Sequence, residues 1–171
     1  MGLRPARCYR NKERPFTRQS RKKPRKGYVK GVPMAKIRKF ELGNPKADFE
    51  KSFYLVSSEV VQIRHNALEA ARVILHKSLE KEVGKGIYFA KILVYPHHVL
   101  RENLLATGAG ADRFQTGMRK AYGKVVSTAA QVKSGQRILM VRVNQGKETG
   151  AKAAIKAAAS KLPLRFTIVA G

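Results

Sequence analysis

The sequence has little acidic charge, a single cysteine and no tryptophan. Asp and Glu number 11 against 36 Lys and Arg, which gives a formal net charge of +25. Because such self-repulsion destabilises a compact chain, a polyanionic partner such as RNA or DNA is the economical explanation. The one cysteine, Cys8, excludes an intramolecular disulfide framework and suits a reducing compartment.

The sequence also lacks long apolar runs, so it predicts no membrane-spanning helix and no membrane partner. The basic N-terminus has no apolar h-region of a secretory signal, and no lipidation motif is evident. What is present is a chain of 171 residues, 43% of them hydrophobic, which is enough for one globular domain with one core.

The positive charge is concentrated at the N-terminus. Residues 1–39 hold 15 Lys or Arg and one acidic residue, and repeated Pro and Gly make a long helix before Ile37 unexpected. A disordered tail would have a similar composition. Tyr9, Phe16 and Tyr28, however, are interleaved with the cations, and such rings stack on bases while cations meet phosphates. We therefore expect residues 1–36 to form an extended basic arm that orders on RNA.

The rest of the chain, residues 37–171, predicts a single α+β domain. Apolar periodicity and turn signals predict two helices, over 58–83 and 148–162, and strands over 36–43, 49–56, 87–96, 124–132, 137–143 and 165–169. The intervening "KSGQ" favours a hairpin between the strands at 124–132 and 137–143. The expected architecture is a two-layer sandwich, with both helices packed on a mixed or antiparallel sheet.

The first helix has a predicted start, stop and buried face. Ser57 or Ser58 offers an N-cap, and Gly84 is placed to end the helix. Helical spacing puts six apolar residues near one face, which is therefore expected to be buried: Val60, Ile63, Ala67, Ala71, Ile74 and Leu79.

A glycine-rich, cationic stretch separates the predicted strands in the middle of the chain. A dinucleotide fingerprint that starts at Gly108 and Gly110 would need a third glycine where Arg113 stands. A phosphate-binding Walker loop fails as well, because five residues separate Gly117 from Gly123. A flexible surface insertion is one interpretation of residues 103–118. The other is a loop whose backbone amides and arginines approach phosphates.

The residues that usually carry catalysis or bind metals show no useful pattern. The adjacent His97 and His98 point apart, and the spacing of His65 and His76 on a helix does not suit shared metal ligation. We expect His65 and His76 to be solvated or partly packed, and Asp112 to accept hydrogen bonds. No catalytic residue, metal, cofactor or small-molecule substrate is expected.

Five segments carry a specific resemblance to a known family: "RPARCYR", "GVPMAKIRKFELGN", "ALEAARV", "HHVLREN" and above all "GAGADRFQTGMRKAYGK". They resemble the archaeal and eukaryotic large-subunit ribosomal protein ten-e, the counterpart of bacterial ribosomal protein sixteen. The resemblance implies an α/β-hammerhead type of fold on large-subunit rRNA. It also implies a cytoplasmic, ribosome-bound protein at the base of the central protuberance, near the 5S rRNA region and the A-site side, beside other ribosomal proteins. The end at Gly171 favours the archaeal type.

The same resemblance implies which residues bind RNA. The expected rRNA contacts are Arg4, Arg7, Tyr9, Arg10, Lys12, Arg14, Arg18, Arg21, Lys22, Lys23, Arg25, Lys26, Arg64 and His65. The loop is expected to face the peptidyl-transferase centre and the tRNA acceptor arm through Arg101, Gly108, Gly110, Asp112, Arg113, Phe114, Gln115, Arg119, Lys120 and Lys124. One alternative is a ribosome-assembly factor or RNA chaperone that binds rRNA transiently. Another, from a different class, is a nucleotide-dependent RNA-modifying enzyme, but no sequence motif supports it.

Overall fold

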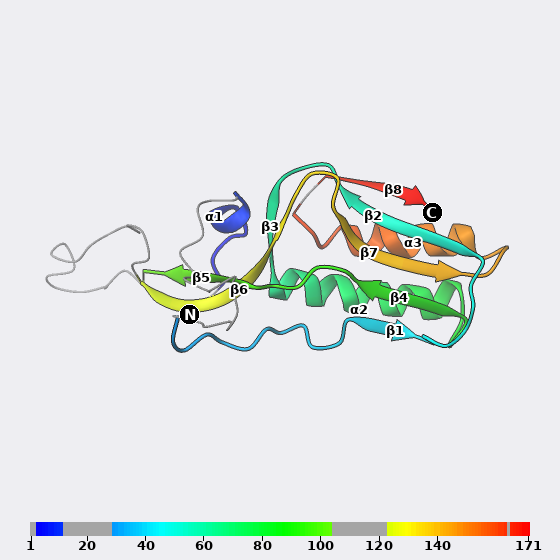
Figure 1. Cartoon of the computed structure of the whole chain (residues 1–171), viewed down its shortest axis with the longest axis horizontal. Coiled ribbons are helices and arrows are strands. Elements are labelled where there is room, and N and C mark those ends of the chain that lie inside the picture. The colour runs from blue at the N-terminus through cyan, green and yellow to red at the C-terminus, as the bar shows by residue number, and fades with distance from the viewer. Residues whose placement is uncertain (1–2, 12–28, 104–122, 164) are drawn as a thin grey trace, which may run out of the picture.

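The computed structural model describes residues 3–11, 29–103, 123–163 and 165–171, which form an α+β fold with two antiparallel sheets (Figure 1). The five-stranded sheet has the order β1 (Glu41–Gly43), β4 (Tyr88–Ile92), β7 (Arg137–Val143), β2 (Lys51–Ser57) and β8 (Phe166–Ala170). The three-stranded sheet has the order β3 (Val61–Arg64), β6 (Lys124–Val132) and β5 (His98–Glu102). The helices are α1 (Arg7–Arg10), α2 (His65–Glu82) and α3 (Glu148–Ala159).

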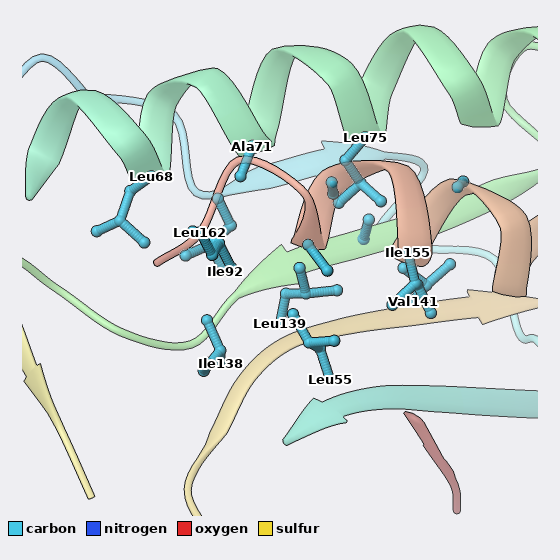
Figure 2. Packing of buried hydrophobic residues seen from close by; sticks show 14 of the residues in the cluster. Leu55, Leu68, Ala71, Leu75, Ile92, Ile138, Leu139, Val141, Ile155 and Leu162 are labelled. Carbon is cyan, nitrogen blue, oxygen red and sulfur yellow. The ribbon is translucent and has the colours of Figure 1, made fainter. Parts of the chain in front are cut away.

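The core lies between the five-stranded sheet and the two long helices (Figure 2). Strands β2 and β7 are paired so that Leu55 lies opposite Leu139, and both side chains are buried beneath α3. Helix α2 packs along α3 and buries Leu75 completely. Burying one such leucine contributes about 1.5–3 kcal/mol. The predicted two-layer arrangement of two helices on an antiparallel sheet is therefore confirmed for this half of the molecule.

The start of the first long helix differs from the prediction. Helix α2 begins at His65, and the segment Val61–Arg64 is instead strand β3, which pairs with β6. The reason is that Val61 and Ile63 are β-branched and find a strand partner in β6, which is far away in the sequence. The predicted N-cap at Ser57 or Ser58 was therefore wrong.

The buried face of α2 is also rotated relative to the predicted face. Its buried apolar residues are Leu68, Ala71, Leu75 and Leu79, whereas Ile74 is only partly buried, and Val60 precedes the helix and is exposed. The predicted end is confirmed. The Gly84 amide donates to the Leu79 carbonyl oxygen over 3.1 Å, and Gly84 has the positive φ of +112° that such a terminator adopts.

The predicted hairpin around "KSGQ" was wrong, although both strands and the turn exist. The Gln136 amide donates to the Lys133 carbonyl oxygen, but β6 and β7 then enter different sheets. Ser57 takes the place of a hairpin partner: its amide donates to Gln136 and its carbonyl oxygen accepts from Gly135. The turn is thus the crossing point from the three-stranded to the five-stranded sheet.

Strand bounds are confirmed where a ladder forms and are too long elsewhere. The strands predicted at 124–132 and 137–143 match β6 and β7, and those at 49–56 and 165–169 correspond to β2 and β8. Residues 36–40 and 93–96 were predicted as strand but lie outside β1 and β4. Strand β5 was not predicted, and the second helix ends at Ala159 rather than 162.

Candidate nucleic-acid interface

The N-terminal residues 3–11 pack against the three-stranded sheet rather than extending away from it (Figure 1). In β3, the side-chain Nε2 atom of Gln62 donates to the backbone carbonyl oxygens of Tyr9, over 3.1 Å, and of Asn11, over 2.9 Å. The Arg64 guanidinium donates to the Arg4 carbonyl oxygen over 2.9 Å and lies 5.5 Å from the centre of the Tyr9 ring. These contacts fix the first part of the predicted arm on the domain.

The same N-terminal residues contact the base of the 103–118 segment. The Arg4 side chain forms an ion pair with Glu102, the last residue of β5, and also donates to the Asn103 carbonyl oxygen over 3.2 Å. Burial first, and then the Glu102 carboxylate, raises the pKa of the Tyr9 hydroxyl. The sequence predicted the arm and the loop as separate parts, but in the described structure Arg4 of the arm contacts Glu102 and Asn103 at the start of the loop.

Strands β5 and β6 pair up to the described residues that border the central stretch, and this paired end is called the stem. Glu102 pairs with Lys124, and Gly123 between the strands has φ +93°. A Cβ atom on Gly123 would lie 2.7 Å from the Glu102 carbonyl oxygen, so only glycine fits without a shift. Arg101 donates to the Gly123 carbonyl oxygen over 3.1 Å, while its buried Nε atom has no hydrogen-bond partner among the described residues.

The described cations among the predicted phosphate contacts differ in their partners. Arg64 and Arg101 donate to backbone carbonyl oxygens. Arg4 and Arg10 are neutralised in part, because Arg4 pairs with Glu102 and Arg10 with Glu59 over 3.1 Å. Arg7 and Lys124 are exposed, and neither has an acidic partner within residues 3–11, 29–103, 123–163 and 165–171. Arg7 and Lys124 are therefore the described cations best placed to meet a phosphate.

His65 lies inside this region rather than on its surface. Its side chain is buried at 7% exposure, and its Nδ1 atom is 3.2 Å from the Thr128 hydroxyl oxygen in β6. Burial first, and then the nearby Lys36 and Arg64, lowers the pKa of His65. The expectation of a solvated or partly packed residue was wrong for His65. His76 is partly packed as predicted, with Nδ1 2.6 Å from the Tyr88 hydroxyl oxygen.

The remaining predicted contacts lie outside the described residues. They are Lys12, Arg14, Arg18, Arg21, Lys22, Lys23, Arg25 and Lys26 in the arm, and Gly108, Gly110, Asp112, Arg113, Phe114, Gln115, Arg119 and Lys120 in the central stretch. Sequence reasoning missed Gln62 and Glu102, which hold the N-terminal residues. The only available signal for Gln62 was a polar residue between two β-branched residues.

The described ranges also limit the chemistry of the site. Within them, no group of three or more His, Cys, Asp or Glu side chains could hold a metal ion. Within the same ranges, no helix has both the length and the apolar character needed to cross a membrane. What the geometry brings together is an anchored N-terminal segment, the stem, and the cations Arg64, Arg101 and Lys124 of the three-stranded sheet, here called the cationic sheet end.

Comparison with known proteins points to one family. The family model described as Ribosomal protein L16p/L10e matches residues 15–169. A large ribosomal subunit protein uL16 from Staphylothermus marinus is 52% identical over 170 residues, which cover 99% of this chain and 94% of that protein. The uL16 proteins of Hyperthermus butylicus and Archaeoglobus fulgidus are 51% and 45% identical and cover 96% and 99% of this chain, and 91% and 93% of their own length. This chain therefore belongs to the L16p/L10e family of ribosomal proteins.

Proposed function

We propose that this protein is a non-enzymatic, structural constituent of the large ribosomal subunit, cytoplasmic and ribosome-bound, that binds large-subunit rRNA. The family membership over residues 15–169 carries this proposal. The geometry supports it, because Lys124 is exposed opposite Glu102, where Arg4 contacts the stem, and Arg7 is exposed on the N-terminal residues that pack on β3. Cations that neutralise phosphates without base-specific geometry supply affinity and orientation in such complexes.

The finer part of the proposal concerns location. The protein would lie near the central protuberance and the 5S rRNA region, with segment 103–118 directed toward the peptidyl-transferase centre and the tRNA acceptor arm. A close approach of Gly123 to the Glu102 carbonyl group, which favours glycine there, supports a defined exit direction for that segment, since a loose stem would leave its direction open. The segment would then support tRNA placement.

The experiment replaces residues 105–116 by a short Gly/Ser linker and reconstitutes large subunits at matched protein occupancy. The replaced residues lie outside every described helix and strand, so the isolated domain should stay folded, with an unchanged melting temperature. Subunits should incorporate the variant and then fail in tRNA accommodation or peptide-bond formation. Normal peptide-bond formation would contradict the tRNA-facing role while leaving rRNA binding intact.

A second measurement tests resident against transient binding. A structural constituent should stay with the large subunit in stoichiometric amount through a high-salt wash, whereas an assembly factor or RNA chaperone would be removed. Replacing Lys22, Lys23, Arg25 and Lys26 by Gln should reduce the slope of log affinity against log salt by roughly 0.7–0.9 for each phosphate that is no longer neutralised. These four changes leave residues 3–11, and therefore the docking on β3, untouched.

A further inference from the structure

A pocket outside the cationic sheet end has no role in the function described so far. It has a volume of about 400 Å³ and lies where residues 32–40 run beside the connection from β4 to β5. The side chains that give it its character are Met34, Arg38, Phe40, Tyr95, His97 and Thr128. Thr128 belongs to β6, so the pocket lies where the chain passes between the two sheets.

Three aromatic rings contact one another along this pocket, and Tyr95 still leaves half of its surface exposed. The Phe40 and Tyr95 ring centroids are 5.4 Å apart, with an interplanar angle of 27°. The Tyr95 and His97 centroids are 4.4 Å apart, with an angle of 45°. Offset and tilted pairs at these separations are the favourable geometries for aromatic rings. These two ring contacts therefore restrict the rotamer of Tyr95 in the free protein.

The backbone explains why these rings remain accessible. Along residues 93–97, Val94 and Pro96 are buried while Leu93, Tyr95 and His97 are exposed, which is the alternation of an extended chain. The buried residues anchor the segment, and the exposed ones project outward. Phe40 packs partly against the core, and Tyr95 leaves 50% of its surface to solvent.

The chemistry of the pocket selects its ligand. A large aromatic residue at half exposure, held by neighbouring rings, is a surface on which another flat ring can stack at little entropic cost. Arg38 is exposed at the same pocket, and none of the described residues that line the pocket is acidic. A flat ring attached to an anion fits this combination of apolar faces and one cation. An apolar protein segment would use Met34 and Tyr95 but would gain nothing from Arg38.

We propose that this pocket holds one unstacked nucleobase of single-stranded RNA on Tyr95, with a neighbouring phosphate on Arg38. The inference rests on the proposed function, since it assumes that the polyanion is RNA, and adds a second, separate contact to it. The cationic sheet end would meet the backbone of the RNA, whereas the pocket would take a base out of its stack. Sequence-tolerant stacking of this kind is how aromatic platforms capture loops and strand junctions.

The test compares two polyanions on the full-length protein. One is a fluorescently labelled short oligouridine, which offers bases and phosphates, and the other is inorganic polyphosphate, which offers charge without bases. Measurements at raised salt suppress the general attraction of the many Lys and Arg side chains. Tyr95→Leu should weaken oligouridine binding by about tenfold, the effect expected for the loss of one base stack, and should leave polyphosphate binding unchanged. Tyr95→Phe keeps the ring and should bind oligouridine like the wild type.

Arg38→Gln is the complementary variant. It should weaken the binding of both ligands and reduce the slope of log affinity against log salt for oligouridine. Tyr95→Leu should lower the affinity without changing that slope. Oligouridine binding by Tyr95→Leu equal to the wild type would overturn the proposal, as would an equal loss for polyphosphate, which would indicate a general electrostatic or folding effect. Melting curves of each variant check that the fold is kept. Retention of the wild-type protein on salt-washed subunits tests the proposed function separately, so either idea can fail alone.

Discussion

The two sheets of this protein are stabilised by different kinds of contact. The five-stranded sheet is covered by α2 and α3 and buries aliphatic residues such as Leu55 and Ile155. The three-stranded sheet also buries apolar residues such as Val61, Ile63 and Val132. It differs in having three buried polar side chains on it or against it, Gln62, His65 and Thr128, and in holding residues 3–11 by hydrogen bonds and an ion pair. Apolar packing is not screened by salt, whereas surface ion pairs are. The five-stranded sheet with α2 and α3, the aliphatic half, therefore supplies most of the stability. The three-stranded sheet with residues 3–11, the polar half, can adapt to a charged partner.

The largest expected effect breaks the aliphatic half. Leu75→Asp would place a carboxylate where the side chain is 0% exposed, and an unpaired buried charge costs several kcal/mol. Against a typical total of about 5–15 kcal/mol, the domain should unfold or nearly unfold. Val73→Asp is the matched control, because Val73 lies two residues away on the same helix and is 46% exposed. Urea unfolding should separate the two variants, and similar midpoints would contradict the assigned face.

A smaller effect should come from the stem of the three-stranded sheet. Gly123→Ala combines an unfavourable positive φ with a Cβ atom 2.7 Å from the Glu102 carbonyl oxygen, and we expect a loss of about 2–3 kcal/mol. Gly135→Ala also has a positive φ, but no atom lies within 4 Å of its Cβ position, so its loss should be about 1 kcal/mol. Hydrogen exchange should show the faster opening of β5 and β6 in the first variant only. Equal losses would mean that the close approach has no energetic consequence.

The third change loosens the N-terminal residues. Gln62→Ala removes the donor to the Tyr9 and Asn11 carbonyl oxygens and should cost about 1–2 kcal/mol. Limited proteolysis should then cut within residues 3–11 much faster, while the melting temperature falls only a few degrees. Exposed Gln145, in the turn before α3, provides the control substitution. Unchanged proteolysis would show that other contacts hold the segment.

The smallest effect is the pH dependence that His65 adds. Because burial lowers its folded pKa below the ordinary value of 6.5, the unfolded chain takes up a proton first as the pH falls. The contribution is therefore complete above pH 6.5 and is lost progressively below it, until the folded state also becomes protonated. His65→Gln should flatten the fall in melting temperature between neutral and mildly acidic pH. A steeper fall in His65→Gln would reverse the sign.

The sequence predicted the aliphatic half better than the polar half, for a physical reason. Alternation and helical spacing are local patterns, and they located β2, β6, β7 and most of α2 and α3. Strand β3 could not be seen in this way, since Val61–Arg64 becomes a strand only because β6 lies beside it. The same limit applies to the site. Composition predicted a cationic N-terminus, but nothing local indicated that Arg4 would pair with Glu102.

The strand order has a consequence for the protein during its own synthesis. Among the described strands, β3 pairs only with β6, and β2 lies between β7 and β8. The three-stranded sheet therefore cannot be completed before residues 124–132 have been made, nor the five-stranded sheet before residues 166–170. Residues 1–39, with a net charge of +14, emerge long before the docking surface on Gln62 and Glu102 is complete. Chains with such distant pairings fold slowly. For that interval residues 3–11 of the newborn chain lack the surface on which they later dock, and any nearby polyanion competes for their cations first.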